Sequence, residues 1–102
     1  MIRDFFLGFI KIHILYHAGK KPVYGVWLIE ELTRHGYQIS PGTLYPTLHA
    51  LTQKGYLRCY ESVVSGKVRK YYELTDKGLV MLKEARAKIS ELVREVLLEE
   101  DE

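Results

Sequence analysis

The stretch SPGTLYPTLHALTQKGYLR, from Ser40 to Arg58, constrains the fold more strongly than any other part of the chain. It predicts a short helix, because Ser40 is suited to the N-cap and Pro41 to the first helical position, where the missing N–H costs nothing. Gly55 is suited to end the helix just after Lys54, a cation that interacts favourably with the helix dipole. Three leucines at i, i+4 and i+7 form one apolar stripe: Leu44, Leu48 and Leu51. The helix is therefore expected to bury one face and to expose the others to solvent.

The faces away from the leucine stripe carry small polar and ring-bearing side chains. They are Thr43, Tyr45, Pro46, Thr47, His49, Ala50 and Gln53. Because Pro46 stands at about the sixth helical position, it can leave a carbonyl unpaired, and we expect a tight or slightly kinked first turn. His49 is either simply exposed to solvent or, with Tyr45 and Thr47 beside it, a contact to a phosphate or a base.

Two segments rich in β-branched and aromatic residues follow, residues 56–64 and 68–74, and the SGK tripeptide between them predicts a β-hairpin. Residues 53–70 contain five Lys or Arg against one acid, a local balance of +4, whereas residues 91–102 have a balance of −5. A surface that binds phosphates concentrates one sign of charge in this way, and an ordinary solvated hairpin tip is the alternative. A helix followed by a basic hairpin is the order of a winged helix-turn-helix, which inserts the helix into a DNA groove and sets the hairpin on the flanking backbone.

The segments GTLYPTLHALTQKGYL and SGKVRKYYELTDKG, together with the earlier VYG at residues 23–25, resemble the PadR family of winged-helix transcriptional regulators. The resemblance runs from about Phe5 to the end of the chain, and the order and spacing of LYP, KGYL and KYYELT make it specific. It implies a dimeric repressor that binds palindromic operators. It also implies that short members of the family dimerise through the helix after the hairpin together with the N-terminal helix.

The rest of the chain predicts three more helices, with no repeat, linker or low-complexity tract. The first covers about residues 4–16 and is apolar on more than one face, the second covers about residues 24–35, and the last covers about residues 76–99, capped by Thr75. We therefore expect a mainly α fold with a small β-hairpin and a long C-terminal helix. It comprises a winged-helix DNA-binding domain that includes the N-terminal helix, residues 1–74, and a C-terminal dimerisation helix, residues 75–102, in one compact unit.

The last helix carries an apolar stripe with a three-then-four spacing, which predicts a homodimer. A helix of some six turns cannot pack its whole apolar length on a winged-helix core of about 70 residues, and the same helix of a second copy is the simplest partner. A helix folded back along its own domain is the alternative. The expected interface comprises Leu82, Ala85, Ile89, Leu92 and Val96 with Phe5, Phe6 and Phe9 of the first helix.

Double-stranded DNA is the expected partner, with the helix after Ser40 in the major groove. The expected contacts of this helix are Thr43, Tyr45, Thr47 and His49, and the family resemblance adds Pro46, which with Tyr45 belongs to the part that faces DNA. The basic residues expected to hold phosphates or reach a minor groove are Lys67, Arg69 and Lys70, and Lys54 is expected to add a phosphate contact.

Two further features suggest small ligands. His13 and His17 have the four-residue spacing that can chelate zinc, but no Cys or well-placed acid completes a site, and we expect neither a metal nor a cofactor. Trp27 stands where the family usually has a polar residue, and it is either a boundary tryptophan or an aromatic wall for a ligand or a partner protein. The dimer interface is either dry and fully packed, which we favour, or the site of a small aromatic effector that contacts Phe9 and Trp27.

Other classes of protein have little support in the sequence. No glycine elbow, oxyanion motif, pair of carboxylates or phosphate loop indicates an enzyme. The single cysteine, Cys59, forms no internal disulfide and is expected to be a half-buried strand residue. The apolar run at residues 5–10 is too short for a signal peptide, and no stretch approaches the ~20 apolar residues of a membrane span, so we expect a cytoplasmic protein. A winged-helix protein-interaction module without specific DNA binding and an RNA-binding protein remain as alternatives.

Overall fold

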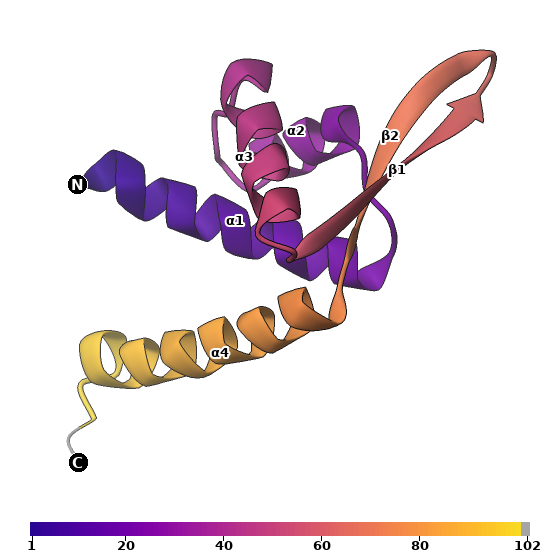
Figure 1. Cartoon of the computed structure of the whole chain (residues 1–102). Helices are drawn as coiled ribbons and strands as arrows, with labels where there is room; N and C mark the ends of the chain where they lie inside the picture. Colours follow the sequence, from indigo (N-terminus) through magenta and orange to yellow (C-terminus); the bar gives the residue numbers. More distant parts are fainter. Residues whose placement is uncertain (101–102) are drawn as a thin grey trace.

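The computed structural model describes residues 1–100, which form four α-helices and one antiparallel hairpin (Figure 1). The elements are α1 (Ile2–Lys20), α2 (Gly25–Arg34), α3 (Pro41–Gln53), β1 (Leu57–Val64), β2 (Lys67–Leu74), α4 (Asp76–Leu92) and a π-helical segment, η1 (Val93–Leu97). The expected fold class is confirmed: three helices and a hairpin form a winged helix, and a long helix follows.

The bounds of α3 agree with the local signals in the sequence. Pro41 is its first residue, and Gly55 follows its end with a φ of +83°, a conformation that glycine adopts at no steric cost. The helix continues through Pro46, and its three leucines face the core. Ser40 is the N-cap residue as predicted, but its hydroxyl accepts no hydrogen bond from the helix and instead donates to the Thr43 hydroxyl at 3.4 Å.

The hairpin has a two-residue turn and is attached to the domain at its base. Ser65 and Gly66 form the turn, with φ values of +51° and +78°, the combination of a type I′ turn that suits the twist of paired strands. At the base, Val23 and Tyr72 exchange backbone hydrogen bonds of 2.9 and 2.8 Å. The tip therefore projects from the domain while the base is held by the segment between α1 and α2 (Figure 1).

The core lies where α1 meets α2, α3, the base of the hairpin and the start of α4. Its fully covered side chains include Ile14, Leu28, Leu32, Leu44 and Leu48. The predicted extent of α1, residues 4–16, is too short, because the helix continues to Lys20. Gly19 stays helical and packs closely on β2, with the place for a Cβ only 2.9 Å from the Leu74 side chain.

The start of α4 is fastened to the end of α3. Thr75 caps α4 as predicted, since its hydroxyl oxygen accepts from the Gly78 N–H at 3.0 Å. The same hydroxyl donates to the carbonyl of Gly55 at 2.5 Å, and the Lys77 ammonium donates to the carbonyl of Lys54 at 2.7 Å. These bonds join the two helices across 20 or more residues of sequence.

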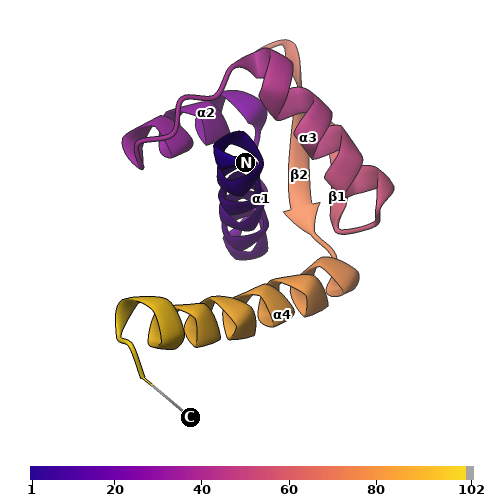
Figure 2. The ribbon, with the colours of Figure 1, turned by 90° about the vertical axis from the view of Figure 1, so that its left-hand side faces the viewer.

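The first turns of α1 and the second half of α4 extend on the side opposite to the hairpin tip, which makes the molecule elongated, 56 × 29 × 20 Å (Figure 1). Figure 2 shows α1 nearly end-on, with α2 and α3 above it and α4 crossing beneath. Among the described residues, no helix has both the length and the apolar character that crossing a membrane requires.

Candidate nucleic-acid interface

The outer face of α3 is open to solvent over most of its length. Helical spacing sets Gly42, Pro46, His49, Ala50 and Gln53 away from the buried leucines, and all five are exposed. Of the contacts predicted from the sequence, Tyr45, Pro46, His49 and Lys54 are exposed, whereas Thr43 and Thr47 are half-buried. Gly42, Ala50 and Gln53 lie on the same face and were not among the predicted contacts.

Thr47 has a restricted hydrogen-bonding role. Its hydroxyl donates to the backbone carbonyl of Thr43, one helical turn earlier, at 2.8 Å. Because a hydroxyl has one proton, the oxygen retains only acceptor capacity toward a further partner. In a hydrogen bond to a base, the Thr47 oxygen would therefore accept from an amino group, such as adenine N6 or cytosine N4.

Tyr45 connects α3 to the start of α2. Its phenol lies directly over Gly25, where any Cβ would overlap the ring and the hydroxyl. Gly25, the glycine of the VYG segment, is therefore needed for the close approach of the two helices. Tyr45 also borders a groove of about 690 Å³ between the start of α2 and the hairpin tip, and Arg69 is among the residues that line this groove.

Arg69 is held in place by aromatic side chains. Its guanidinium lies 4.0 Å from the centre of the Tyr24 ring and donates to the Tyr71 hydroxyl at 3.4 Å, which raises the pKa of Arg69. The Tyr71 ring is in turn stacked on the Tyr60 ring, with their centroids 5.6 Å apart. Sequence reasoning missed these tyrosines, although Tyr71 stands two residues after Arg69 and so faces the same side of the strand.

The remaining hairpin cations differ in their surroundings. Lys67 and Lys70 are exposed, and strand alternation sets Lys70 on the opposite face from Lys67 and Arg69. Lys70 stands opposite Glu61 in the strand register, and Arg58 forms an ion pair with Glu73 across the strands. The positive charge at the tip is therefore carried chiefly by Lys67 and Arg69.

Of the two candidate effector contacts, Phe9 lines a cavity next to α4, and Trp27 does not line this cavity. Phe9 lines a cavity of about 400 Å³ between α1, the end of α2 and α4, together with Leu82 and Ile89. Trp27 is not among the residues that line it; its ring packs against the His17 ring, with centroids 5.4 Å apart. Trp27 is therefore separate from the cavity beside Phe9.

The sequence model of the PadR-like family of transcriptional regulators matches residues 14–84, from the middle of α1 into α4. The chain belongs to this family. The family resemblance stated from the LYP, KGYL and KYYELT segments is thereby confirmed, and the protein is a PadR-like transcriptional regulator.

Individual relatives agree with this assignment. The PadR-like chain is 48% identical over 96 residues, 94% of its length and 90% of the relative's, to transcriptional regulator Rv3488 of Mycobacterium tuberculosis. A PadR-like transcription factor from Bacteroides fragilis has a similar structure, with a TM-score of 0.82, 30% identity and 96% of each chain covered. A PadR family transcriptional regulator from Eggerthella lenta also has a TM-score of 0.82, with 34% identity over 99% of this chain and 91% of that one.

Proposed function

We propose that this PadR-like regulator binds operator DNA as a homodimer and represses transcription. The observation that supports the proposal most directly is the groove that Tyr45 of α3 and the start of α2 share with the hairpin tip, on which Arg69 is held. A cation that is already immobilised loses little side-chain entropy when it binds a phosphate.

In this proposal α3 enters the major groove and the hairpin contacts the flanking backbone or a minor groove. Tyr45, Pro46 and His49 are the exposed contacts of α3, and the half-buried Thr43 and Thr47 lie at its edges. Lys67, Arg69 and Lys70 contact phosphates from the hairpin, and Lys54 does so from the end of α3.

The apolar surface of α1 and α4 supports the proposed homodimer. Leu92 and Val96 are 50% and 57% exposed, and Phe5 and Phe6 on α1 are 49% and 46% exposed. Their elements extend on the same side of the molecule, so a second copy could cover both sets (Figure 1). Ala85, Ile89 and Phe9 are half-buried and complete the proposed interface. Leu82, which the stripe included, is 6% exposed and packs within its own domain core.

A small aromatic effector is part of the same proposal, and the cavity beside Phe9 is its proposed site. Because Leu82 and Ile89 of α4 form one wall, a bound ligand would displace the proposed dimer helix and change the separation of the two copies of α3. Trp27 would report on the ligand indirectly, through its packing on His17.

The hairpin offers a direct test of DNA binding. A genomic binding experiment with the purified protein would first identify an operator, and repression would be measured with a reporter gene behind it. Replacement of Lys67, Arg69 and Lys70 by Ala should then weaken binding to all sequences and reduce the slope of log K against log salt by about 2–3, because fewer counterions are released.

A matched control removes three exposed cations from α1 and α4, namely Lys11, Lys83 and Lys88. Both triple variants change the net charge equally, so a general effect of charge would lower their affinities and salt slopes alike. An unchanged salt slope in the hairpin variant would show that the hairpin does not contact the DNA backbone.

A further inference from the structure

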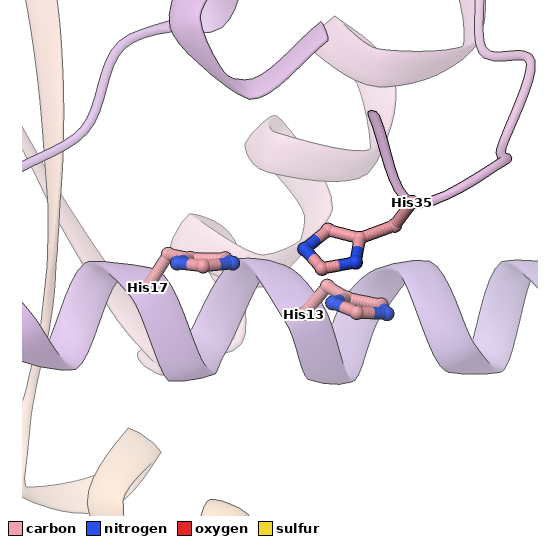
Figure 3. A group of neighbouring side chains, drawn as sticks. All are labelled: His13, His17 and His35. Carbon is pink, nitrogen blue, oxygen red and sulfur yellow. The ribbon is translucent and has the colours of Figure 1, made fainter. Parts of the chain in front are cut away.

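Three of the four histidines of the chain lie together at the contact between α1 and the end of α2 (Figure 3). His13 and His17 stand one turn apart on α1, and His35 follows α2. One ring nitrogen from each can be chosen so that all three lie within 4.8 Å of one another. The sequence showed only the pair on α1, since the approach of His35 depends on how α2 crosses α1.

A carboxylate completes the cluster. Oε2 of Glu31 lies 3.0 Å from Nε2 of His35 and 3.5 Å from Nε2 of His17, and the Glu31 side chain is only 11% exposed. Ligand atoms about 2.1 Å from a tetrahedral ion are about 3.4 Å from one another. The two contacts of Glu31 are near this spacing, and modest rotations of the imidazole rings would bring the histidine nitrogens, which lie within 4.8 Å of one another, to it.

The environment favours the form of histidine that binds metals. Burial lowers the pKa of both His13 and His17, and the neighbouring His35 lowers that of His13 further. Hydrogen bonding from Arg34 lowers the pKa of Glu31, which keeps this carboxyl ionised. Neutral imidazoles and a carboxylate are the protonation states in which these groups act as ligands.

We propose that His13, His17 and His35, with Glu31, bind a divalent first-row transition ion of the zinc class. Imidazole is a ligand of intermediate softness that suits Zn²⁺, Co²⁺ and Ni²⁺, whereas Mg²⁺ and Ca²⁺ require oxygen-rich sites. The ion would join α1 to the end of α2, the helix before the proposed recognition helix. The three histidines also line the cavity between α1, the end of α2 and α4, so the ion would lie next to the proposed dimer helix.

The proposal is tested with metal alone, without DNA, on the full chain freed of any histidine tag. Calorimetric titration with Zn²⁺ should give one ion per chain, and Co²⁺ should give the visible absorption bands of a tetrahedral site. Because the Trp27 ring is 5.4 Å from the His17 ring, Co²⁺ should also quench the emission of this single tryptophan, and excess Zn²⁺ should restore it. Zn²⁺ at about a hundredfold its Kd should raise Tm by roughly 10 °C.

Variants locate the site. His13→Ala and His35→Ala should each lower the Zn²⁺ affinity at least tenfold, and Glu31→Gln should lower it by about tenfold. His49→Ala removes the one histidine outside the cluster, which lies on α3, and should leave the Zn²⁺ affinity unchanged. Circular dichroism confirms that each variant is folded, and His35→Gln replaces His35→Ala if the alanine variant is not.

Two results would overturn the site. One is a wild-type protein that binds no stoichiometric Zn²⁺ and gives only the spectrum of hydrated Co²⁺. The other is stoichiometric binding that His13→Ala, His35→Ala and His35→Gln leave as tight as in the wild type, which would assign the metal to other groups. Both results are independent of whether the protein binds an operator.

Discussion

At the scale of single residues, Tyr72 shows how burial sets chemistry at the base of the hairpin. Its ring is 6% exposed, and burial, followed by the neighbouring Cys59, raises the pKa of its hydroxyl to about 12. Cys59 stands directly opposite in the strand register and is half-buried, as the sequence predicted. The folded chain therefore retains this phenolic proton at a pH where the unfolded chain releases it.

We predict that Tyr72 makes stability depend on pH in alkaline solution. The stabilisation is complete below the unfolded pKa of 10.0 and is lost as pH rises to about 12, because the unfolded state then binds fewer protons. Urea titrations at pH 8, 10 and 11.5 should show the stability advantage of wild type over Tyr72→Phe falling by roughly 1–2 kcal/mol, given about 1.4 kcal/mol per pKa unit. The control is Tyr60→Phe, an exposed ring on the neighbouring strand. If the stability difference between wild type and Tyr72→Phe stayed constant from pH 8 to 11.5, folding would not raise the pKa of Tyr72.

At the scale of elements, local signals predicted what local interactions determine. The start and end of α3 follow from Pro41 and Gly55, and the start of α4 follows from Thr75, because each signal acts within one turn of the chain. The end of α1 was missed: the helix continues through Gly19, where the lack of a side chain allows close packing on Leu74, a contact that the sequence does not record.

In the candidate sites, too, the sequence predicts the features that depend on local periodicity and not those that depend on contacts between elements. The exposed face of α3 could be read from helical periodicity, which needs no knowledge of tertiary structure. The support of Arg69 by Tyr24 and the approach of His35 to His13 depend on how separate elements cross, and no spacing in the sequence records that angle. The pairing of Arg58 with Glu73 follows from the strand register, which depends on the turn being two residues long.

The contact between α4 and the end of α3 gives a second prediction. A Cβ at Gly78 would overlap the backbone carbonyl of Tyr56, which cannot move aside as a side chain can. Gly78→Ala should lower the free energy of unfolding by about 1–3 kcal/mol, measured by urea denaturation. Gly8→Ala, in a helical position with no atom within 4 Å of the new methyl group, should instead raise it by about 0.5–1 kcal/mol. A Gly78→Ala protein as stable as wild type would mean that the helices do not pack as closely as described.

At the scale of the whole molecule, the hairpin tip and the proposed dimer surface lie at opposite ends. The tip carries Lys67 and Arg69 together with the exposed Val63 and Val68, and the opposite end carries the exposed apolar side chains of α1 and of the last turns of α4 and η1 (Figure 1). A molecule with this division has separate surfaces for a charged partner and for a second copy of itself. The proposed DNA contact and the proposed dimer contact therefore do not compete for surface.

We predict that a charge on the apolar end of α4 separates the dimer. Leu92→Asp should convert a dimer into a monomer near 11.9 kDa, measured by light scattering after gel filtration, because burying an unpaired carboxylate costs several kcal/mol. Ala87→Asp introduces the same charge at an exposed position on the opposite face of the helix and should leave the dimer intact. Survival of the dimer in folded Leu92→Asp and Val96→Asp variants would place the interface elsewhere.

The hydrogen bonds between Thr75 and Gly55 and between Lys77 and Lys54 make α3 and the start of α4 turn together. In the proposed dimer, the rotational phase of α4 then sets the direction in which each α3 meets the DNA. One residue inserted into α4 beyond Leu82 would rotate the following helix by about 100°, whereas seven would nearly restore its apolar face. The DNA helix repeats about every 10.5 base pairs, so the direction in which each α3 faces depends on its position along the DNA. A rotation of α4 would therefore change the half-site spacing that the dimer prefers. Relatives could thus diverge in operator architecture through the length of one helix, with every residue that contacts DNA unchanged.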